Sequence, residues 1–411
     1  MPLARPSFGL TGLMVLFSIT HAYATDYHVC DCGIGADSDC VVGDDNNVGT
    51  DVNNPWQGHE KGRNTFATIN GGDAILFCEG GAWDINSGNS RWVNSNCSTN
   101  NRCEIGTYLP HWASGDEVKP VLRRLDGSHG MEFADGGAAN HESGYVIRGL
   151  HLMGTPNSTS FGMFFYNDID DVTVDDVKIE GFQVGFHLAG SNPCDSNDTL
   201  CDGKNDNIDL LNSEVVNNLE QGWLGGSTNS SIINNVFMNN GNRAVFDHNI
   251  YISGDTVDMV VQNNSLKYSA LDSNGDCQGT SLVVHGKHHN LLIDGNYVEE
   301  DIGMAGQGCW GIAVDGGYSS AEQFSQVTIS NNTVKNVGNL AIGVGSCQNC
   351  TIENNVIQQF QAIGTRGIMA PDRVRGSGDA ISTDIVVRNN TLYFGPNSSG
   401  TGITVKDEGS N

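Results

Sequence analysis

Three histidines and one lysine are concentrated in one short stretch of this acidic chain. Residues 281–296 read SLVVHGKHHNLLIDGN, which places His285, Lys287, His288 and His289 within five positions. The chain carries 20 Lys and Arg against 48 Asp and Glu, for a formal net charge of −28. A local group of bases in such a protein suits an anionic ligand, because the overall field of the protein repels anions.

The apolar residues before His285 indicate a strand that directs its side chain outward. If Leu282 and Val284 point into a core, His285 points to the surface, because successive side chains of a strand alternate between its two faces. Neighbouring repeats of the same pattern place further polar and aromatic residues on that surface: Asn249, Tyr251 and Ser253 before, and Trp310 and Asp315 after.

This set of side chains is suited to β-elimination in a uronic-acid polysaccharide. The reaction requires a neutralised carboxylate, a base for the proton beside it, and an acid for the departing oxygen. We predict these catalytic residues: His285, Lys287, Tyr251 and His248. The predicted substrate-binding residues are Arg243, Ser253, Asn249, Trp310 and Arg366. Asp247 and Asp315 are predicted to bind Ca²⁺, which, like His248 or Arg243, would offset the substrate carboxylate.

Internal repeats show which elements would position these residues. A short β-type run followed by Asn or Asp recurs, and its final polar residue falls at 176, 213, 235, 264, 296, 332, 355 and 390. The steps between these positions are 37, 22, 29, 32, 36, 23 and 35, which indicates a base period near 22 residues with insertions. Short strands at such a period, with 53 Gly and 9 Pro, predict a solenoid.

The recurring asparagines predict a shared turn in successive coils. Asn tolerates left-handed backbone geometry, and its side-chain amide can hydrogen-bond the equivalent residue of the next coil. The Asn-Asn-Val turns, as in Asn234-Asn235-Val236 and Asn354-Asn355-Val356, and the run Asn249–Gly254 resemble those of right-handed parallel β-helix proteins, the pectate-lyase-like superfold. The resemblance spans residues 40–411 and implies an all-β solenoid with an N-terminal cap and disulfide-stapled loops.

The same superfold carries other chemistries. Inverting hydrolysis needs two carboxylates about 6.5–9.5 Å apart, and adjacent aspartates are missing from the expected strands. Alginate-epimerase-like enzymes usually show Asp-Pro-His, whereas Phe246-Asp247-His248-Asn249 lacks the proline. His288 and His289 read equally well as turn residues, and Tyr251 as an aromatic stacked on its neighbouring coil. Arg366, Arg373 and Arg375 are either a subsite clamp or a solvated loop.

Composition and the amino terminus set the cellular context. The net charge of −28 argues against nucleic acid and anionic lipid as partners. Residues 1–24 combine Arg5, an apolar run and Ala22-Tyr23-Ala24, which is typical of a signal peptide. We therefore expect secretion without membrane insertion, a cap and first coils over 25–140, and β-helix repeats over 141–411. The last strand pattern ends near Glu408, where further chain, a partner or a polar tail should cover the solenoid.

Twelve cysteines in an exported chain predict disulfides rather than metal ligands. Close spacing favours Cys97–Cys103, Cys194–Cys201 and Cys347–Cys350, with Cys277–Cys309 as a further pair. A metal knuckle at Cys30, Cys32 and Cys40 is the alternative at the amino terminus.

From the sequence we expect a secreted, monomeric polysaccharide lyase that acts on an acidic polysaccharide. The alternatives are a non-catalytic glycan-binding surface or matrix protein, and a β-helix glycoside hydrolase or epimerase.

Overall fold

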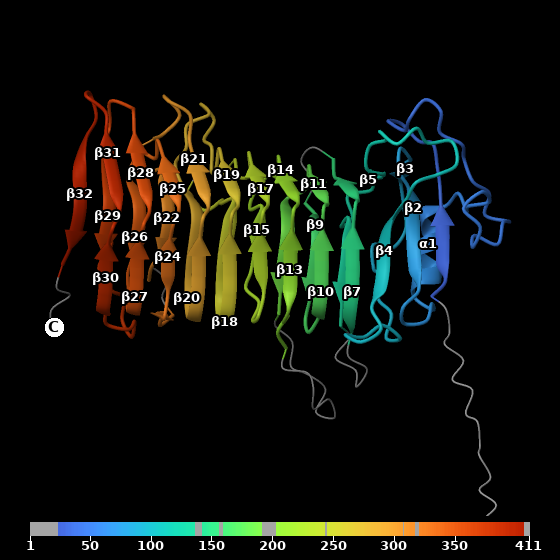
Figure 1. Ribbon diagram of the computed structural model, residues 1–411, viewed down its shortest axis with the longest axis horizontal. Helices are drawn as coiled ribbons and strands as arrows, with labels where there is room; N and C mark the ends of the chain where they lie inside the picture. The colour runs from blue at the N-terminus through green and yellow to red at the C-terminus, as the bar shows by residue number, and fades with distance from the viewer. Residues whose placement is uncertain are drawn as a thin grey trace, which may run out of the picture.

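A computed structural model describes residues 24–135, 142–155, 159–190, 203–242, 245–306, 308–316 and 320–406. The chain winds into an elongated solenoid whose strands stack side by side from one end to the other (Figure 1). The described residues form a 21-stranded and an 11-stranded sheet, and the pairings between coils are parallel. Each coil therefore supplies hydrogen-bond partners to the coils on both sides.

The 11-stranded sheet takes one short strand from each coil. Its members are β3 (Ala82–Ile85), β5 (Val121–Arg124), β8 (His151–Met153), β11 (Lys178–Glu180), β14 (Glu214–Val216), β17 (Val236–Met238), β19 (Ser265–Lys267), β21 (Tyr297–Glu299), β25 (Thr333–Lys335), β28 (Val356–Gln359) and β31 (Thr391–Phe394).

The 21-stranded sheet contains two rows of strands. The first row comprises β6 (Met131–Ala134), β9 (Phe161–Tyr166), β12 (Val184–Ala189), β15 (Trp223–Leu224), β18 (Ile250–Gln262), β20 (Thr280–Asp294), β22 (Trp310–Val314), β26 (Leu340–Val344), β29 (Gly364–Ala370) and β32 (Ser399–Val405). The second row comprises β1 (Asp26–Val29), β2 (Ala74–Cys78), β4 (Cys103–Tyr108), β7 (Ser143–Arg148), β10 (Asp170–Asp175), β13 (Ile208–Leu211), β16 (Ser231–Ile233), β23 (Gln323–Ser325), β24 (Thr328–Ser330), β27 (Cys347–Glu353) and β30 (Thr383–Arg388). The long strands β18 and β20 bend from the first row into the second.

The core follows from the period-two pattern. In register across the first row, Ile250, Leu282, Ile312, Ile342 and Ile368 point inward and are buried. Burial of these aliphatic columns along the whole solenoid contributes most of the free energy that favours folding. Polar residues occupy the alternate positions of the strands and therefore stay outside the core.

The predicted asparagine ladder is present. In each pair of neighbouring turn residues, one adopts the left-handed backbone conformation and the other makes the hydrogen bond to the next coil. The first asparagine of a pair takes the left-handed conformation, as Asn263 does with φ of 55°. The second is buried and donates its side-chain amide to the next coil: Asn235 to Asn264, Asn264 to Asn296, Asn296 to Asn332, Asn332 to Asn355, and Asn355 to Asn390, at 2.9–3.0 Å. Each buried amide is therefore satisfied within the turn.

At the amino-terminal end, helix α1 (His59–Phe66) lies against the first coils (Figure 1). The sheet continues across the predicted domain boundary at residue 140, because β4 on one side of it pairs with β7 on the other. The boundary itself stays a prediction. No helix among the described residues has the length and apolar composition needed to span a bilayer.

Disulfides link neighbouring segments of the solenoid. The predicted pairs Cys97–Cys103, Cys277–Cys309 and Cys347–Cys350 are confirmed. Cys30 pairs with Cys78 and Cys32 with Cys40, so the metal-knuckle alternative is wrong. The pair predicted at Cys194 and Cys201 lies outside the described residues.

Candidate active site

The first row brings three predicted catalytic rings together. Tyr251 lies on the outward face of β18, and Ser253 pairs in register with His285 of β20. The Tyr251 ring meets His285 edge to face at 5.9 Å between centroids, and meets His248 in the same manner at 5.4 Å. These rings form one cluster on adjacent coils, in which Tyr251 is partly exposed and His248 and His285 are largely buried.

A buried glutamate that the sequence analysis did not identify orients His285. The Nδ1–H of His285 donates to Glu322 Oε1 at 3.1 Å, and the backbone N–H of Gly286 donates to the same oxygen at 2.8 Å. A proton held on Nδ1 leaves the Nε2 lone pair as the basic site. Gly286 has φ of 121°, and a Cβ there would lie 2.0 Å from the Gly254 carbonyl, so this bend requires glycine.

Two aspartates meet beside His285. Asp315 and Asp372 are both buried, and Asp315 Oδ1 lies 4.0 Å from His285 Nε2. Burial, followed by the neighbouring Asp372 carboxyl, raises the pKa of Asp315 to about 9. Burial also raises the pKa of Asp372. Both shifts favour the protonated form, because two neighbouring buried carboxylates do not ionise together readily.

Arg373 supplies the positive charge of the site. Its Nη2 forms an ion pair with Asp315 Oδ2, and its guanidinium lies 5.3 Å from the centroid of the Trp310 ring. The Arg373 side chain is 38% exposed, whereas the Asp315 side chain is 0% exposed. Arg373 is thus a cation that a ligand can reach on the outward face of β22.

Loops inserted between strands deliver these charged groups. Glu322 is in turn held by Asp379, whose Oδ1 accepts from the Glu322 backbone N–H at 2.9 Å. A Cβ on Gly343 would lie 2.4 Å from Asp372 Oδ2, so the small residue on β26 leaves room for the loop. Sequence reasoning missed Glu322, Asp372 and Asp379. The available signal was coil length, because the steps of 36 and 35 residues contain these insertions.

Some predicted site residues are buried elsewhere. Asn249 is 0% exposed; its Oδ1 accepts from Asn240 and its amide donates to the Lys267 carbonyl. The prediction that Asn249 binds substrate is therefore wrong. Asp247 is likewise 0% exposed and accepts from the Asn242 backbone N–H at 3.2 Å.

His248 cannot offset a substrate carboxylate. Burial lowers the pKa of its imidazole to about 4, and its Nδ1–H donates to the Thr280 carbonyl at 2.7 Å. The ring is thus neutral at ordinary pH, and its place beside Tyr251 is that of an uncharged neighbour.

The remaining members of the basic stretch lie beyond the bend at Gly286. Lys287 is exposed and lines a separate pocket with His289 and Gln323. His288 is buried and donates through Nε2 to the His285 carbonyl at 3.0 Å, so its role is structural. The structure therefore separates Lys287 from the ring cluster around His285.

The other predicted binding residues are distributed around the cluster. Ser253 lines a groove of about 740 Å³. Trp310 packs under Arg373, whereas Arg366 lies two coils further on and donates to Asn339 Oδ1 at 2.8 Å. Arg243 lies outside the described residues.

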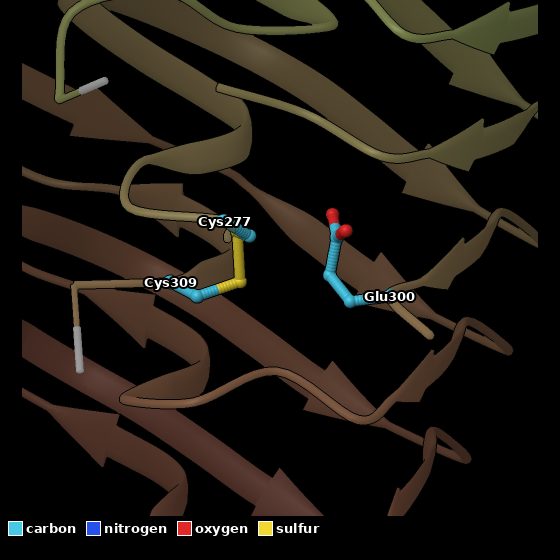
Figure 2. Close-up of side chains that lie close together, drawn as sticks. All are labelled: Cys277, Glu300 and Cys309. Atoms are coloured by element: carbon cyan, nitrogen blue, oxygen red, sulfur yellow. A yellow bond between two sulfur atoms is a disulfide. The ribbon is translucent and has the colours of Figure 1, made fainter. Parts of the chain in front are cut away.

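Asp315 is predicted to bind Ca²⁺, which prefers six to eight oxygen ligands. In the structure its carboxylate forms an ion pair with Arg373, and the carboxylate oxygens of Asp315 and Asp372 make no hydrogen bond to the residues that the structure describes. The calcium site therefore stays a prediction. The described part of the chain contains one group of potential ligand atoms within 4.8 Å of one another, Cys277, Glu300 and Cys309 (Figure 2). Its two sulfurs are joined in a disulfide, so they offer no thiolate to a metal.

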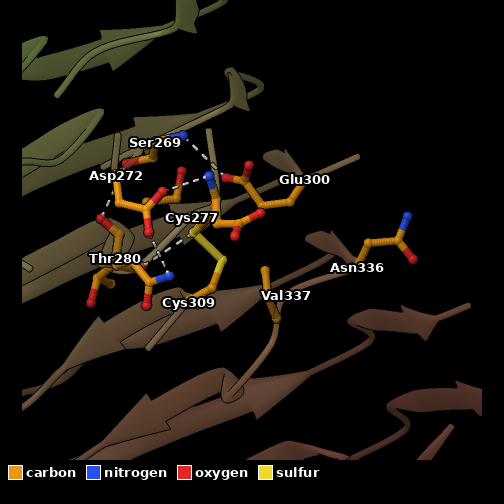
Figure 3. Close-up of a disulfide and its surroundings, with 12 residues drawn as sticks. Ser269, Asp272, Cys277, Thr280, Glu300, Cys309, Asn336 and Val337 are labelled. Carbon is orange, nitrogen blue, oxygen red and sulfur yellow. Dashed lines mark hydrogen bonds between the residues drawn. A yellow bond between two sulfur atoms is a disulfide. The ribbon is translucent and has the colours of Figure 1, made fainter. Parts of the chain in front are cut away.

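Glu300 is a buried acid beneath the strands that carry the site. Its Oε1 accepts from the Ser269 backbone N–H at 3.1 Å, next to the Cys277–Cys309 disulfide (Figure 3). Burial raises the pKa of Glu300 to about 8. The disulfide ties the segments that lead into β20 and β22, which holds the strands of His285 and Asp315 together.

Comparison with solved structures identifies the architecture. An endo-xylogalacturonan hydrolase from Aspergillus tubingensis superposes with a TM-score of 0.52 at 14% identity, covering 94% of this chain and 100% of the other. The chain has the pectate-lyase-like, right-handed parallel β-helix fold. The GH136 lacto-N-biosidase from Eubacterium ramulus shares this β-helix with a TM-score of 0.51 at 11% identity, over 90% of this chain and 68% of that one.

Pectate lyase Pel9A is a more distant β-helix, with a TM-score of 0.43 at 12% identity over 89% of this chain and 80% of that one. Neither a family model nor a curated protein sequence matches the chain. The fold is therefore shared with the hydrolase and the biosidase, and any reaction must be argued from the site.

Proposed function

We propose that this β-helix protein is a secreted lyase that cleaves an acidic polysaccharide by β-elimination. The observation that carries the proposal is the arrangement of an imidazole, a hydroxyl and an accessible cation on one outward face. These groups are His285, Tyr251 and Arg373. The five disulfides among the described residues suit the oxidising destination of an exported protein.

In the proposed reaction, Arg373 binds the uronate carboxylate and lowers the cost of charge developing next to it. His285 Nε2 removes the proton from the carbon that bears the carboxylate, and the Tyr251 hydroxyl protonates the glycosidic oxygen as its bond to the neighbouring carbon breaks. The electron pair of the broken C–H bond becomes the new carbon–carbon double bond. Glu322 keeps the His285 ring in the required tautomer and orientation.

Hydrolysis is a second candidate because Asp315 and Asp372 form the carboxyl pair that the strands alone lacked. Adjacent aspartates are missing from the strands themselves, but a loop after β29 brings Asp372 beside Asp315. The pair is nonetheless buried behind Arg373, whereas Tyr251 and Arg373 are reachable. The ion pair with Arg373 favours Asp315 as a support for the charged site rather than as a group that touches a sugar.

The test is to incubate the secreted protein with alginate, pectate, glucuronan and glycosaminoglycans, with and without Ca²⁺ or a chelator. Ultraviolet absorbance of an unsaturated uronate, appearing with one substrate, supports the lyase. New reducing ends without that absorbance would establish the hydrolase instead, and glycan binding without either product would indicate a binding protein. Loss of activity on chelation alone would support the calcium prediction.

A further inference from the structure

An aromatic cluster lies on the same outward face as the candidate site but several coils nearer the amino terminus. It consists of His129, Phe161, Phe164, Tyr166 and His187. His129 stacks on Phe161 at 4.9 Å, Phe161 meets His187 edge to face at 4.5 Å, and Phe164 contacts both His187 and Tyr166. We call this cluster the aromatic platform. Its members are partly exposed, and Tyr166 reaches 36%.

The platform is in register with the site. Phe164 pairs with His187, His187 with Leu224, and Leu224 with Tyr251, so these outward positions form one row across β9, β12, β15 and β18. At about 4.8 Å per strand, His187 lies about 10 Å and Phe164 about 14 Å from Tyr251 along the solenoid.

A groove of about 740 Å³ runs from His187 of the platform to Ser253, which pairs in register with His285. Between them it is lined by residues that include Gly225 and Gly226 after β15. The face is closed on the other side of His285, since Val283 is 3% and Ala313 is 0% exposed.

The platform is uncharged at neutral pH. Burial, and then the nearby His129, lowers the pKa of His187 to about 4, and burial lowers the pKa of His129. Neutral rings with exposed faces suit the C–H surface of a sugar ring, because the face of a π-system carries partial negative charge. Exposed apolar patches of this kind mark binding surfaces.

We infer that the aromatic platform is a distal sugar-binding site for the chain whose scissile bond lies over Tyr251 and His285. The inference rests on the proposed function for its substrate class. A pyranose ring in an extended chain is about as long as one strand spacing of about 4.8 Å, so the platform holds a ring two to three units from the one over Tyr251. A trisaccharide centred on the scissile bond does not reach it, and an octasaccharide does.

The test measures binding, so that it does not depend on turnover. Trisaccharides and octasaccharides of mannuronate, galacturonate and glucuronate are titrated calorimetrically into the full chain carrying His285→Ala. We expect one octasaccharide to bind at least about tenfold tighter than its trisaccharide, and Phe164→Ala to remove that advantage. Phe164→Leu keeps apolar bulk without a ring face and should lose the advantage too, which separates stacking from a packing defect.

Tyr393→Ala is the matched control. Tyr393 is 46% exposed and packs against Phe360 at 5.4 Å, but lies on β31 in the other sheet, so its loss should leave the length advantage intact. The inference is overturned if the advantage survives Phe164→Ala, or if no octasaccharide binds more tightly than its trisaccharide. Length-dependent binding without turnover of the unmutated chain would support the platform and refute the lyase. Turnover of the unmutated chain without length-dependent binding would support the lyase and refute the platform.

Discussion

At the scale of single residues, the candidate site depends on side chains that are far apart in the sequence, and a local sequence pattern does not show that they meet. The sequence predicted the outward placement of His285 and Tyr251, because alternation along a strand is a local property. Glu322 and Asp372 could not be assigned in this way, since they reach the site from loops. Glu322 lies 37 residues after His285, and Asp379 lies 57 residues after Glu322.

Replacing either ring of the proposed acid–base pair should stop turnover. We expect His285→Ala and Tyr251→Phe each to lower kcat by about 10²–10⁴-fold, because each removes one proton-transfer step. The thermal unfolding midpoint should stay close to that of the unmutated protein for Tyr251→Phe. His289→Ala is the control, since His289 is an exposed neighbour whose Nδ1 hydrogen-bonds Ser325 Oγ at 2.9 Å. Near-normal rates in both site variants would refute the proposed site.

Arg373 and Arg366 offer a direct comparison between two arginines of the same face. Arg373→Ala should raise KM for the acidic polysaccharide and lower kcat, because the variant lacks the charge that offsets the carboxylate. Arg366→Ala should have little effect. The exposed Arg366 side chain lies two coils away from Trp310 and hydrogen-bonds Asn339. The measurement is steady-state kinetics of both variants, which gives KM and kcat on the polysaccharide that proves to be a substrate. Equal losses in both variants would contradict the assignment of Arg373 to the site.

At the scale of elements, the repeat was the most predictable feature. Tight turns that need a left-handed residue and a buried amide select Asn pairs, and the pairs appear in the sequence as a period. The insertions between strands have no such repeating constraint. Their lengths were visible, but the contacts that their side chains make were not.

Glu300 should lower the stability of the strands beneath the site as the pH rises from about 4.5 to 8. Its folded pKa of about 8 exceeds the ordinary value of 4.5, so below about pH 4.5 the carboxyl is protonated in both states and has no effect. Between about pH 4.5 and 8 the unfolded state ionises first, and the free energy of unfolding falls by about 1.4 kcal/mol per pH unit at most.

Glu300→Gln removes this ionisation while keeping an oxygen for the Ser269 N–H. We expect the variant to unfold at a higher temperature than the unmutated protein at pH 8, and at a similar temperature at pH 4.5. Thermal unfolding followed by circular dichroism at both pH values is the measurement. A temperature difference that is the same at both pH values would show that Glu300 does not titrate as described.

At the scale of the whole molecule, charge opposes the proposed substrate. The net charge of −28 repels a polyanion at long range, whereas Arg373 attracts it only at contact. Salt screens the long-range term, since the Debye length falls from about 30 Å at 0.01 M to about 8 Å at 0.15 M.

We therefore expect kcat/KM to rise as sodium chloride is increased over this range, with kcat nearly constant. Initial rates at several salt concentrations, on one polysaccharide preparation, provide the measurement. A steady fall of kcat/KM with salt would mean that local attraction at the site governs association.

The loops that carry Glu322 and Asp372 leave the solenoid and return to it without disturbing the asparagine turns on either side, as the unbroken bonds from Asn296 through Asn332 and Asn355 to Asn390 show. Scaffold and specificity are thus separable in this chain. In the proposed function, the strands would fix where a sugar lies, while the inserted loops would decide which charges meet it. Exchanging residues 371–382 for a loop of different charge should retarget the groove to another glycan while the coils remain folded.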